Sequence, residues 1–463
     1  SHKLILPNVS FLRGYPLVRR SSSPNFGKKP LWYDPGVSIR STNHVESHNQ
    51  AHSSSRQRMP IASLYRRLLI PIYLPSFLLA ASQQALLILV PLYVLELGGG
   101  AAFAAVVMGL RGLGMLLFDL PAGVLVSRFG DKPSMMGGLV CMTVAGVAFA
   151  LVENLWLLAP FAILYGVGTS AWMLGRLSYM TDSIEVTERG RALACIGGLM
   201  RLGSFIGPAL GGAAAEFLGY TIAFLGTGVA SGVAALLVWA FTEKVHSRSN
   251  RTGSYLTQLT QIIRSHRRSF TTAGCFALGI QLMRSGQQLF IPLFGAAAGL
   301  DAAVIGGIYS LSSALDMSLF YPVGLVMDRW GRKWMSVPSM ALFAFALLLF
   351  PLVTGFYTLL GIALLLGLAN GLSAGIVMIL GADLAPRDLR AEFLGVWRLI
   401  GDLGWTGGPL LIGLLVEVAS LTAAAFAVAG IGILGLGVLV LFVDETLHSS
   451  KPGPDPTNDQ FPN

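Results

Sequence analysis

The chain has 463 residues, of which 54% are hydrophobic and only 12% are Asp, Glu, Lys or Arg. Soluble domains carry roughly 25% charged residues, so this composition excludes an ordinary soluble enzyme and indicates a protein that spans a bilayer. The formal net charge of +9 arises mostly in residues 1–58, which contain nine basic and two acidic residues, and the rest of the chain offers no basic surface for nucleic acid.

Residues 1–58 are rich in Ser, Pro and Arg, show no hydrophobic period and precede the first methionine, Met59. Two interpretations are open. The segment is a basic targeting sequence of the organelle type, or it is upstream sequence joined to a protein whose natural start is Met59, which we favour. In both cases we expect a disordered leader outside the fold.

From about residue 68 the sequence is a series of apolar segments, and a helix needs about 20 apolar residues to cross a membrane. Helices are predicted because isolated strands leave backbone groups unpaired in lipid, and the segments lack the alternation of a barrel. The predicted fold is therefore an all-α membrane protein. Its twelve transmembrane helices are placed at 69–97, 101–126, 134–153, 156–180, 191–217, 219–241, 269–298, 302–327, 335–354, 357–382, 391–416 and 421–443.

These spans form two groups of six. We predict an N-terminal six-helix bundle at residues 59–241, a cytoplasmic linker at 242–268, a C-terminal six-helix bundle at 269–443 and a cytoplasmic tail at 444–463.

Basic residues occupy every second connection between the spans, whereas the alternate connections contain no Lys or Arg. This asymmetry follows the positive-inside rule and predicts that both termini are cytoplasmic. We expect a multi-pass protein of the cell (inner) membrane, or of an organelle membrane if residues 1–58 are a targeting segment.

The two halves align at one fixed offset of 201 residues. Chance similarity between Gly-rich apolar segments explains a few glycine pairs, but not proline and charged positions that share one offset. Two parallel six-helix halves suit alternating access around a site at mid-membrane. The matched pairs include Pro121 with Pro322, Gly123 with Gly324, Arg128 with Arg329, Gly130 with Gly331, Lys132 with Lys333, Asp182 with Asp383, and Pro208 with Pro409.

The segment 324–333 resembles the signature loop between the second and third helices of each half in the major facilitator superfamily. The resemblance extends over residues 69–445 and implies a secondary transporter with this twelve-helix fold. It rests on Gly324, Asp328, Arg329, Gly331, Arg332 and Lys333, and on a degraded first-half copy with Gly123, Arg128 and Gly130. Ser127 stands where the family has Asp, and Asp131 where it has Arg.

Charges in this loop are expected to act in conformational gating. They can pair across the two bundles, or with carbonyls at helix C-termini, and such pairs hold one conformation. Because the first-half Asp is missing, we expect the second half to carry this lock. The alternative is that these charges only set the membrane topology.

A second motif resembles the fifth helix of drug:proton antiporters, in which small residues permit close packing and Pro permits a bend. Generic small-residue packing is the alternative. Such antiporters often have a basic residue in the fourth helix, where Ala162 and Leu164 stand here, and an acid in the first, where Gln83 and Gln84 stand. Proton coupling must therefore use other groups. The motif consists of Gly203, Gly207, Pro208, Gly211 and Gly212.

Ionisable residues inside spans are costly and usually face a cavity or a partner. We expect a substrate and coupling cavity in which Asp316 or Asp402 is the titratable acid, arginines bind an anionic group, and Gln83 and Gln84 add hydrogen bonds. A closed set of structural ion pairs is the alternative. At a rise of 1.5 Å per residue, the charges nearest mid-depth are Arg111, Arg201, Arg284, Asp316, Arg398 and Asp402.

The leading prediction is a secondary active transporter that exports an amphipathic compound in exchange for protons. A facilitator or symporter for a polar metabolite or organic anion is one alternative, and a non-transporting receptor or sensor is another. No catalytic set, metal-ligand cluster or phosphate-binding loop is evident, so we expect no enzymatic activity, cofactor or metal. The expected partners are a small-molecule substrate, protons and the lipid bilayer, with the protein a monomer.

Overall fold

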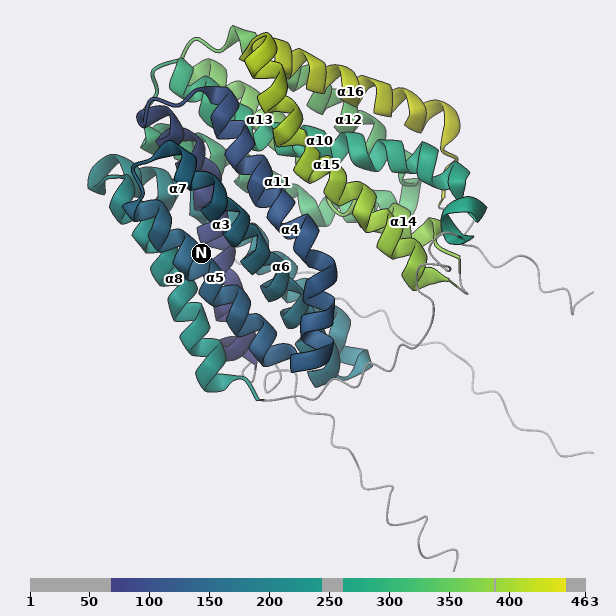
Figure 1. The fold of residues 1–463 in the computed structure, drawn as a ribbon. Helices are drawn as coiled ribbons and strands as arrows, with labels where there is room; N and C mark the ends of the chain where they lie inside the picture. Colours follow the sequence, from purple (N-terminus) through teal and green to yellow (C-terminus); the bar gives the residue numbers. More distant parts are fainter. Residues whose placement is uncertain (1–67, 244–260, 387–388, 447–463) are drawn as a thin grey trace, which may run out of the picture. The chain divides into compact units, whose positions relative to one another are not determined.

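The computed structural model describes residues 68–243, 261–386 and 389–446. These residues belong to one compact unit that begins at Pro60. The leader at 1–58, most of the linker at 242–268 and the tail beyond residue 446 lie outside the described residues. All regular elements within the described ranges are helical (Figure 1).

The first half contains six long helices. A π-helical turn at Leu69–Tyr73 precedes the first of them, and a short 3₁₀ turn at Leu155–Leu157 precedes α6. The helices are α3 (Leu74–Glu96), α4 (Ala101–Phe129), α5 (Asp131–Leu151), α6 (Leu158–Ser183), α7 (Val186–Leu218) and α8 (Tyr220–Phe241).

The second half repeats this order with one interruption. Residues 261–265 are also helical and precede its first long helix. The helices are α10 (Arg267–Ala297), α11 (Ala302–Trp330), α12 (Lys333–Leu348), α13 (Phe356–Leu372), α14 (Ile376–Leu384), α15 (Arg390–Val418) and α16 (Leu421–Phe442).

Ten helical segments of the described chain are long and apolar enough to cross a membrane, when α13 and α14 are counted together. The two remaining predicted spans are α10 and α12. The helix α12 has 16 residues, and α10 carries polar side chains along its 31 residues. The prediction of an all-helical membrane fold is confirmed. Of the twelve predicted spans, ten are confirmed as long and apolar enough to cross a membrane.

One predicted span is broken. The segment 357–382 was expected to be continuous, but α13 ends at Leu372 and α14 begins at Ile376. Gly375 between them has φ of +75°, a left-handed conformation that glycine adopts without strain. The hydroxyl of Ser373 donates to the carbonyls of Ala369 and Asn370, so a side chain satisfies backbone acceptors at the break.

The two halves pack alike. In the first, α3 contacts α7 and α8, α4 contacts α6, and α5 contacts α6 and α8. In the second, α10 contacts α15 and α16, α11 contacts α13, and α12 contacts α13 and α16. Helices at equivalent positions of the sequence repeat therefore make equivalent contacts.

The halves meet mainly along two helix pairs, α7 with α11 and α4 with α15, and α3 also contacts α10 and α11. We call the side with the turns at Gly98, Gly219 and Gly299 the Gly98 end, and the side with the turns at Gly130 and Gly331 the Gly130 end. Three hydrogen bonds join the halves within the described ranges, and they run from mid-depth to the Gly98 end. They link Arg201 to Asp316, Ala209 N to Ser310 Oγ, and Ala302 N to Glu216 Oε2.

Candidate functional site

An ion pair connects the two halves near the middle of the bundle. Arg201 of α7 donates from Nη1 to Asp316 Oδ1 of α11 at 3.0 Å, and the side chains are 22% and 15% exposed. The Arg201 guanidinium also lies 4.2 Å from the ring centroid of Phe320. The structure thus brings together two of the charges that the sequence placed at mid-depth, from opposite halves.

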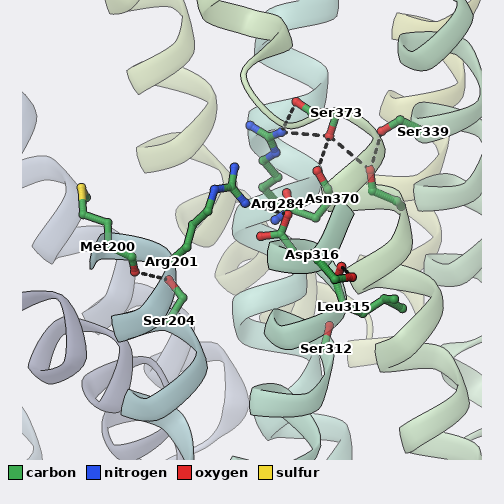
Figure 2. A network of polar contacts seen from close by, with 12 residues as sticks. Met200, Arg201, Ser204, Arg284, Ser312, Leu315, Asp316, Ser339, Asn370 and Ser373 are labelled. Carbon is green, nitrogen blue, oxygen red and sulfur yellow. Dashed lines mark hydrogen bonds and ion pairs between the residues drawn. The ribbon is translucent and has the colours of Figure 1, made fainter. Parts of the chain in front are cut away.

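Arg284 of α10 lies beside this pair, as Figure 2 shows. Its Nη2 donates to the carbonyl and the hydroxyl of Ser373, each at 2.9 Å, and Nη1 donates to Gln281 Oε1. Its Nε is buried without a partner among the described residues. The break between α13 and α14 therefore supplies the acceptors that hold Arg284, as discontinuous helices do at transporter sites.

Arg111 of α4 lies in a different part of the interface. It lines a narrow cavity together with Thr169 of α6, Gln288 of α10 and Trp405 of α15. Its guanidinium lies 5.7 Å from the centroid of the Tyr165 ring. Helices from both halves thus enclose this third arginine.

Arg398 and Asp402 form an ion pair along α15, with Nε and Oδ2 3.3 Å apart. Arg398 also lines a second cavity with Asp119 of α4 and Arg176 of α6. Ser170 donates a short hydrogen bond to Asp119. Asp119 and Arg398 lie nearer the Gly130 ends of their helices than Asp316 and Arg201 do, whereas Asp402 holds the repeat position of Arg201.

The two glutamines of α3 differ in their contacts. Gln84 donates from Nε2 to Ser204 Oγ of α7 at 2.8 Å, while its Oε1 is buried without a partner among the described residues. Gln83 is half-buried. Gln84 therefore joins two helices of the first half.

The signature loop of the second half is held by partners within that half. Arg332 pairs with Asp383 at 3.1 Å and with Asp328 at 3.6 Å. The Glu445 carboxylate accepts from the backbone N–H groups of Arg332 and Lys333 at 2.8 and 3.0 Å. Pairing across the two halves stays a prediction for another conformation.

Glycine makes room for this arrangement. A Cβ on Gly331 would lie 2.6 Å from the Glu445 carboxylate, and Gly331 has φ of +108°. Gly130 occupies the same position in the first half with φ of +90°. Arg128 and Arg329 are exposed, while Gly123 and Gly324 lie inside α4 and α11.

The small-residue motif of α7 has two packing faces. Gly203, Gly207 and Gly211 lie against α3, where an added Cβ would contact Ala80, Ala81 and Ala85. Gly212 and Pro208 face Ala302 and Gly306 of α11 in the other half. The motif therefore packs one helix against its own half and against its partner half.

Several residues of the site were not identified from the sequence. Ser373 accepts hydrogen bonds from Arg284, and Gly375 breaks the helix beside it. The Ser-Ala-Gly run within an apolar span is the signal that could have indicated this break. The Tyr165 ring faces the Arg111 guanidinium, and Trp405 lines the same cavity as Arg111. Their positions depend on helix rotation, for which the sequence carries no comparable signal.

The model of the Major Facilitator Superfamily matches residues 72–321 and 275–461. The chain belongs to the major facilitator superfamily. It is thus a multi-pass membrane protein of a transporter family, and the resemblance read from the signature loop is confirmed. It is 25% identical over 331 residues to the multidrug resistance protein MdtH of Yersinia pestis (strain Pestoides F), covering 68% of this chain and 79% of that protein. MdtH of Yersinia pseudotuberculosis serotype O:3 (strain YPIII) matches equally.

Solved structures of membrane transporters share the fold. A POT family transporter in complex with 5-aminolevulinic acid superposes with a TM-score of 0.68 at 12% identity, covering 82% of this chain and 96% of that chain. The nucleoside transporter NupG gives 0.67 at 14%, with 81% and 100% covered. A bacterial homologue of the human lysosomal transporter Spinster, in an inward-facing and unoccupied conformation, gives 0.67 at 14%, with 84% and 99% covered.

Proposed function

We propose that the protein is a secondary active transporter that exports an amphipathic small molecule in exchange for protons by alternating access. The observation that carries this proposal is the ion pair between Arg201 and Asp316, which crosses the two halves at mid-depth. A pair in this position must separate when the halves move apart. Protonation of Asp316 removes its charge and weakens the pair, so proton binding and helix movement are coupled at one residue.

The moving parts are the two six-helix bundles, residues 59–241 and 269–443. The linker at 242–268 and the tail at 444–463 lie in the cytoplasm in this proposal. The equivalent packing of α3–α8 and α10–α16 supports this division. Each bundle moves as a body because its helices contact one another more extensively than they contact the other half.

The described conformation corresponds to the inward-facing state in this proposal. The hydrogen bonds between the halves lie from mid-depth to the Gly98 end, and the cavity beside Asp119 and Arg398 lies toward the Gly130 end. Basic loops occur at the Gly130 end, which the positive-inside rule places in the cytoplasm. We infer a location in the cell membrane with both termini inside, and function as a monomer.

The name of the MdtH relatives supports export of a drug-like compound. A second candidate is a facilitator or symporter for an organic anion. The observation that favours it is the excess of four arginines over two aspartates near mid-depth, namely Arg111, Arg201, Arg284 and Arg398 against Asp316 and Asp402. A receptor or sensor without turnover is the third possibility, and transport measured in liposomes discriminates against it.

Purified protein in proteoliposomes tests the coupling. A panel of amphipathic fluorescent dyes is measured for accumulation driven by an imposed pH gradient, and for exchange without a gradient. We expect Asp316→Asn to lose gradient-driven accumulation and to retain exchange. Asp301→Asn, an exposed acid at the start of α11, is the matched control and should behave as wild type. Undiminished pH dependence in Asp316→Asn would exclude this residue as the coupling acid.

A further inference from the structure

Arg111 differs from the other mid-span arginines that the structure describes. Arg201 pairs with Asp316, Arg398 pairs with Asp402, and Arg284 donates to Ser373 and Gln281. Arg176 donates to Ser76 Oγ at 3.1 Å and lies over the Trp172 ring.

Arg111 makes no ion pair or side-chain hydrogen bond among the described residues, and its Nη1 is buried and unpartnered. A buried charge without a partner costs several kcal/mol in proteins. Its nearest compensation is the face of the Tyr165 ring, with the centroid 5.7 Å from the guanidinium carbon. A cation–π contact contributes about 0.5–2 kcal/mol, which is less than this cost. The Tyr165 hydroxyl is also buried without a partner in the described part of the chain, so two neighbouring residues both have unused donors.

Close helix packing fixes the position of this arginine. An added Cβ on Gly166 of α6 would collide with the backbone of Arg111. On the other side of α4, Gly109 and Gly112 lie against Leu410 and Thr406 of α15. The backbone that carries Arg111 is therefore held between helices of both halves.

The space in front of Arg111 is small, about 20 Å³, which is room for about one water molecule, and its lining is mixed. Thr169 and Gln288 provide polar groups, whereas Trp405 and the two methionines Met108 and Met115 provide an apolar and aromatic wall. Small-molecule sites commonly combine a mostly apolar wall with a few polar groups that fix orientation. The lining as a whole comes from α4 and α6 of one half and from α10 and α15 of the other.

We propose that this cavity binds the anionic group of an amphipathic organic anion, with Arg111 as the residue that receives a carboxylate or sulfonate. The proposal rests on the transport function inferred above and names the class of its substrate. Guanidinium groups bind such oxyanions through paired, charge-assisted hydrogen bonds. When the halves have moved apart around this cavity, the apolar body of the ligand lies against Trp405, and Gln288 donates an amide hydrogen bond.

The test is equilibrium binding by the purified full chain in neutral detergent, with four probes that share one ring system. They are radiolabelled 2-naphthalenesulfonate and 2-naphthoate, the neutral 2-naphthalenemethanol and the cationic 2-naphthylmethylamine. We expect the wild type to bind both anions more tightly than the amine. Arg111→Gln should weaken sulfonate binding by about tenfold to a hundredfold, the range expected for loss of charge-assisted hydrogen bonds.

Matched variants distinguish an effect of the Arg111 charge on binding from an effect of the substitution on folding. Arg111→Lys should recover part of the sulfonate affinity, and Arg191→Gln, an exposed arginine on α7, should bind as wild type. The neutral alcohol should bind Arg111→Gln as well as it binds the wild type. In the absence of any probe, Arg111→Gln should unfold at the same or a higher temperature than the wild type, because a buried unpaired charge has been removed.

Four results would overturn the inference. Two concern the wild type, which would bind neither anion or would prefer the amine. The third is equal sulfonate affinity in wild type and Arg111→Gln. The fourth is a lower unfolding temperature of Arg111→Gln without ligand, which would assign Arg111 a structural role. Displacement of the sulfonate by phosphatidylglycerol but not by phosphatidylcholine would assign the site to a lipid headgroup instead of the substrate.

The binding assay does not require turnover. Arg111-dependent sulfonate binding without transport of any probe would therefore refute the transport proposal and leave the anion site standing. Conversely, gradient-driven dye transport together with equal sulfonate affinity in wild type and Arg111→Gln would refute the anion site alone.

Discussion

Lys132 and Lys333 occupy the same position in the two halves and donate to the same carbonyl position. The ammonium of Lys132 donates to Trp239 O at 2.6 Å and to Thr242 O at 2.7 Å. Lys333 donates to Val440 O at 3.3 Å, and Val440 is separated from Trp239 by the same 201 residues as the two lysines. Each lysine thus binds the C-terminal turn of the last helix in its half, where carbonyls lack intrahelical partners.

This relationship predicts that removing the two lysine charges lowers the stability of the protein by unequal amounts. Lys132→Met should lower stability by about 1–2 kcal/mol, because charge-assisted hydrogen bonds to two carbonyls are lost. Lys333→Met should cost less, since it loses one longer bond. Thermal unfolding in detergent measures both, with the exposed Arg264→Met as control. Equal effects in all three variants would argue against specific capping by the lysines.

Gly306 and Gly307 provide a test of the close approach between the halves. A Cβ on Gly306 would collide with the Pro208 carbonyl of α7, whereas nothing lies within 4 Å of one on Gly307. Gly306→Val should therefore prevent closure at the Gly98 end and lower transport by about tenfold or more, since small residues set helix–helix distances in membranes. Gly307→Val should transport nearly as wild type. Because both variants place the same β-branched residue in α11, similar losses would indicate a general helix effect instead.

The break between α13 and α14 depends on the conformation of Gly375. A Cβ there has space, with Ile379 as its nearest neighbour at 3.9 Å, but φ is +75°. Gly375→Ala should therefore lose about 1–2 kcal/mol through backbone strain alone, and it should reduce transport because Arg284 depends on Ser373. Gly375→Asn should cost less, since Asn enters the left-handed region more readily.

A glycine inside α13 provides the opposite control. Gly361 is helical, exposed and free of close neighbours, so Gly361→Ala should raise stability by about 0.5–1 kcal/mol. The unfolding temperatures of Gly375→Ala, Gly375→Asn and Gly361→Ala in detergent measure these changes in stability. Stabilisation by Gly375→Ala would mean that the helix does not break where the structure places the break.

The contacts of Glu445 predict that the segment after α16 stabilises the second half. Its carboxylate accepts from two backbone N–H groups at the start of α12, where negative charge is favourable because of the helix dipole. Glu445→Ala should lower stability by about 1–2 kcal/mol, in the range of a lost N-terminal cap. Asp444→Ala removes an exposed neighbouring acid and should change stability little. A larger loss in Asp444→Ala than in Glu445→Ala would contradict this account of the contact.

Much of the fold was predictable because hydropathy is a local property. Long apolar runs, the basic loops and the 201-residue offset were sufficient to place the helices and to divide them into halves. The broken span at 357–382 was missed, because an apolar segment of suitable length reads as one helix unless a positive φ at Gly375 is recognised.

The candidate site was only partly predictable. The sequence indicated that Arg111, Arg201 and Arg284 lie near mid-depth, since depth follows from the helical rise. Arg398 and Asp402 are separated by one helical turn and so share one helix face, and the structure has them paired. The sequence indicated no partner for Arg201 or Arg284, because those partners belong to other helices.

The sequence by itself determined that this is a helical membrane protein of the major facilitator superfamily, built as two repeated halves, because apolar length, basic loops and a fixed offset are written along the chain. Only the tertiary structure decided that Asp316 neutralises Arg201 while Arg111 has no acid beside it in the described residues. Helix rotation and the close contacts at Gly112, Gly166 and Gly306 set those distances, and electrostatic interaction depends on distance in space rather than on separation along the chain.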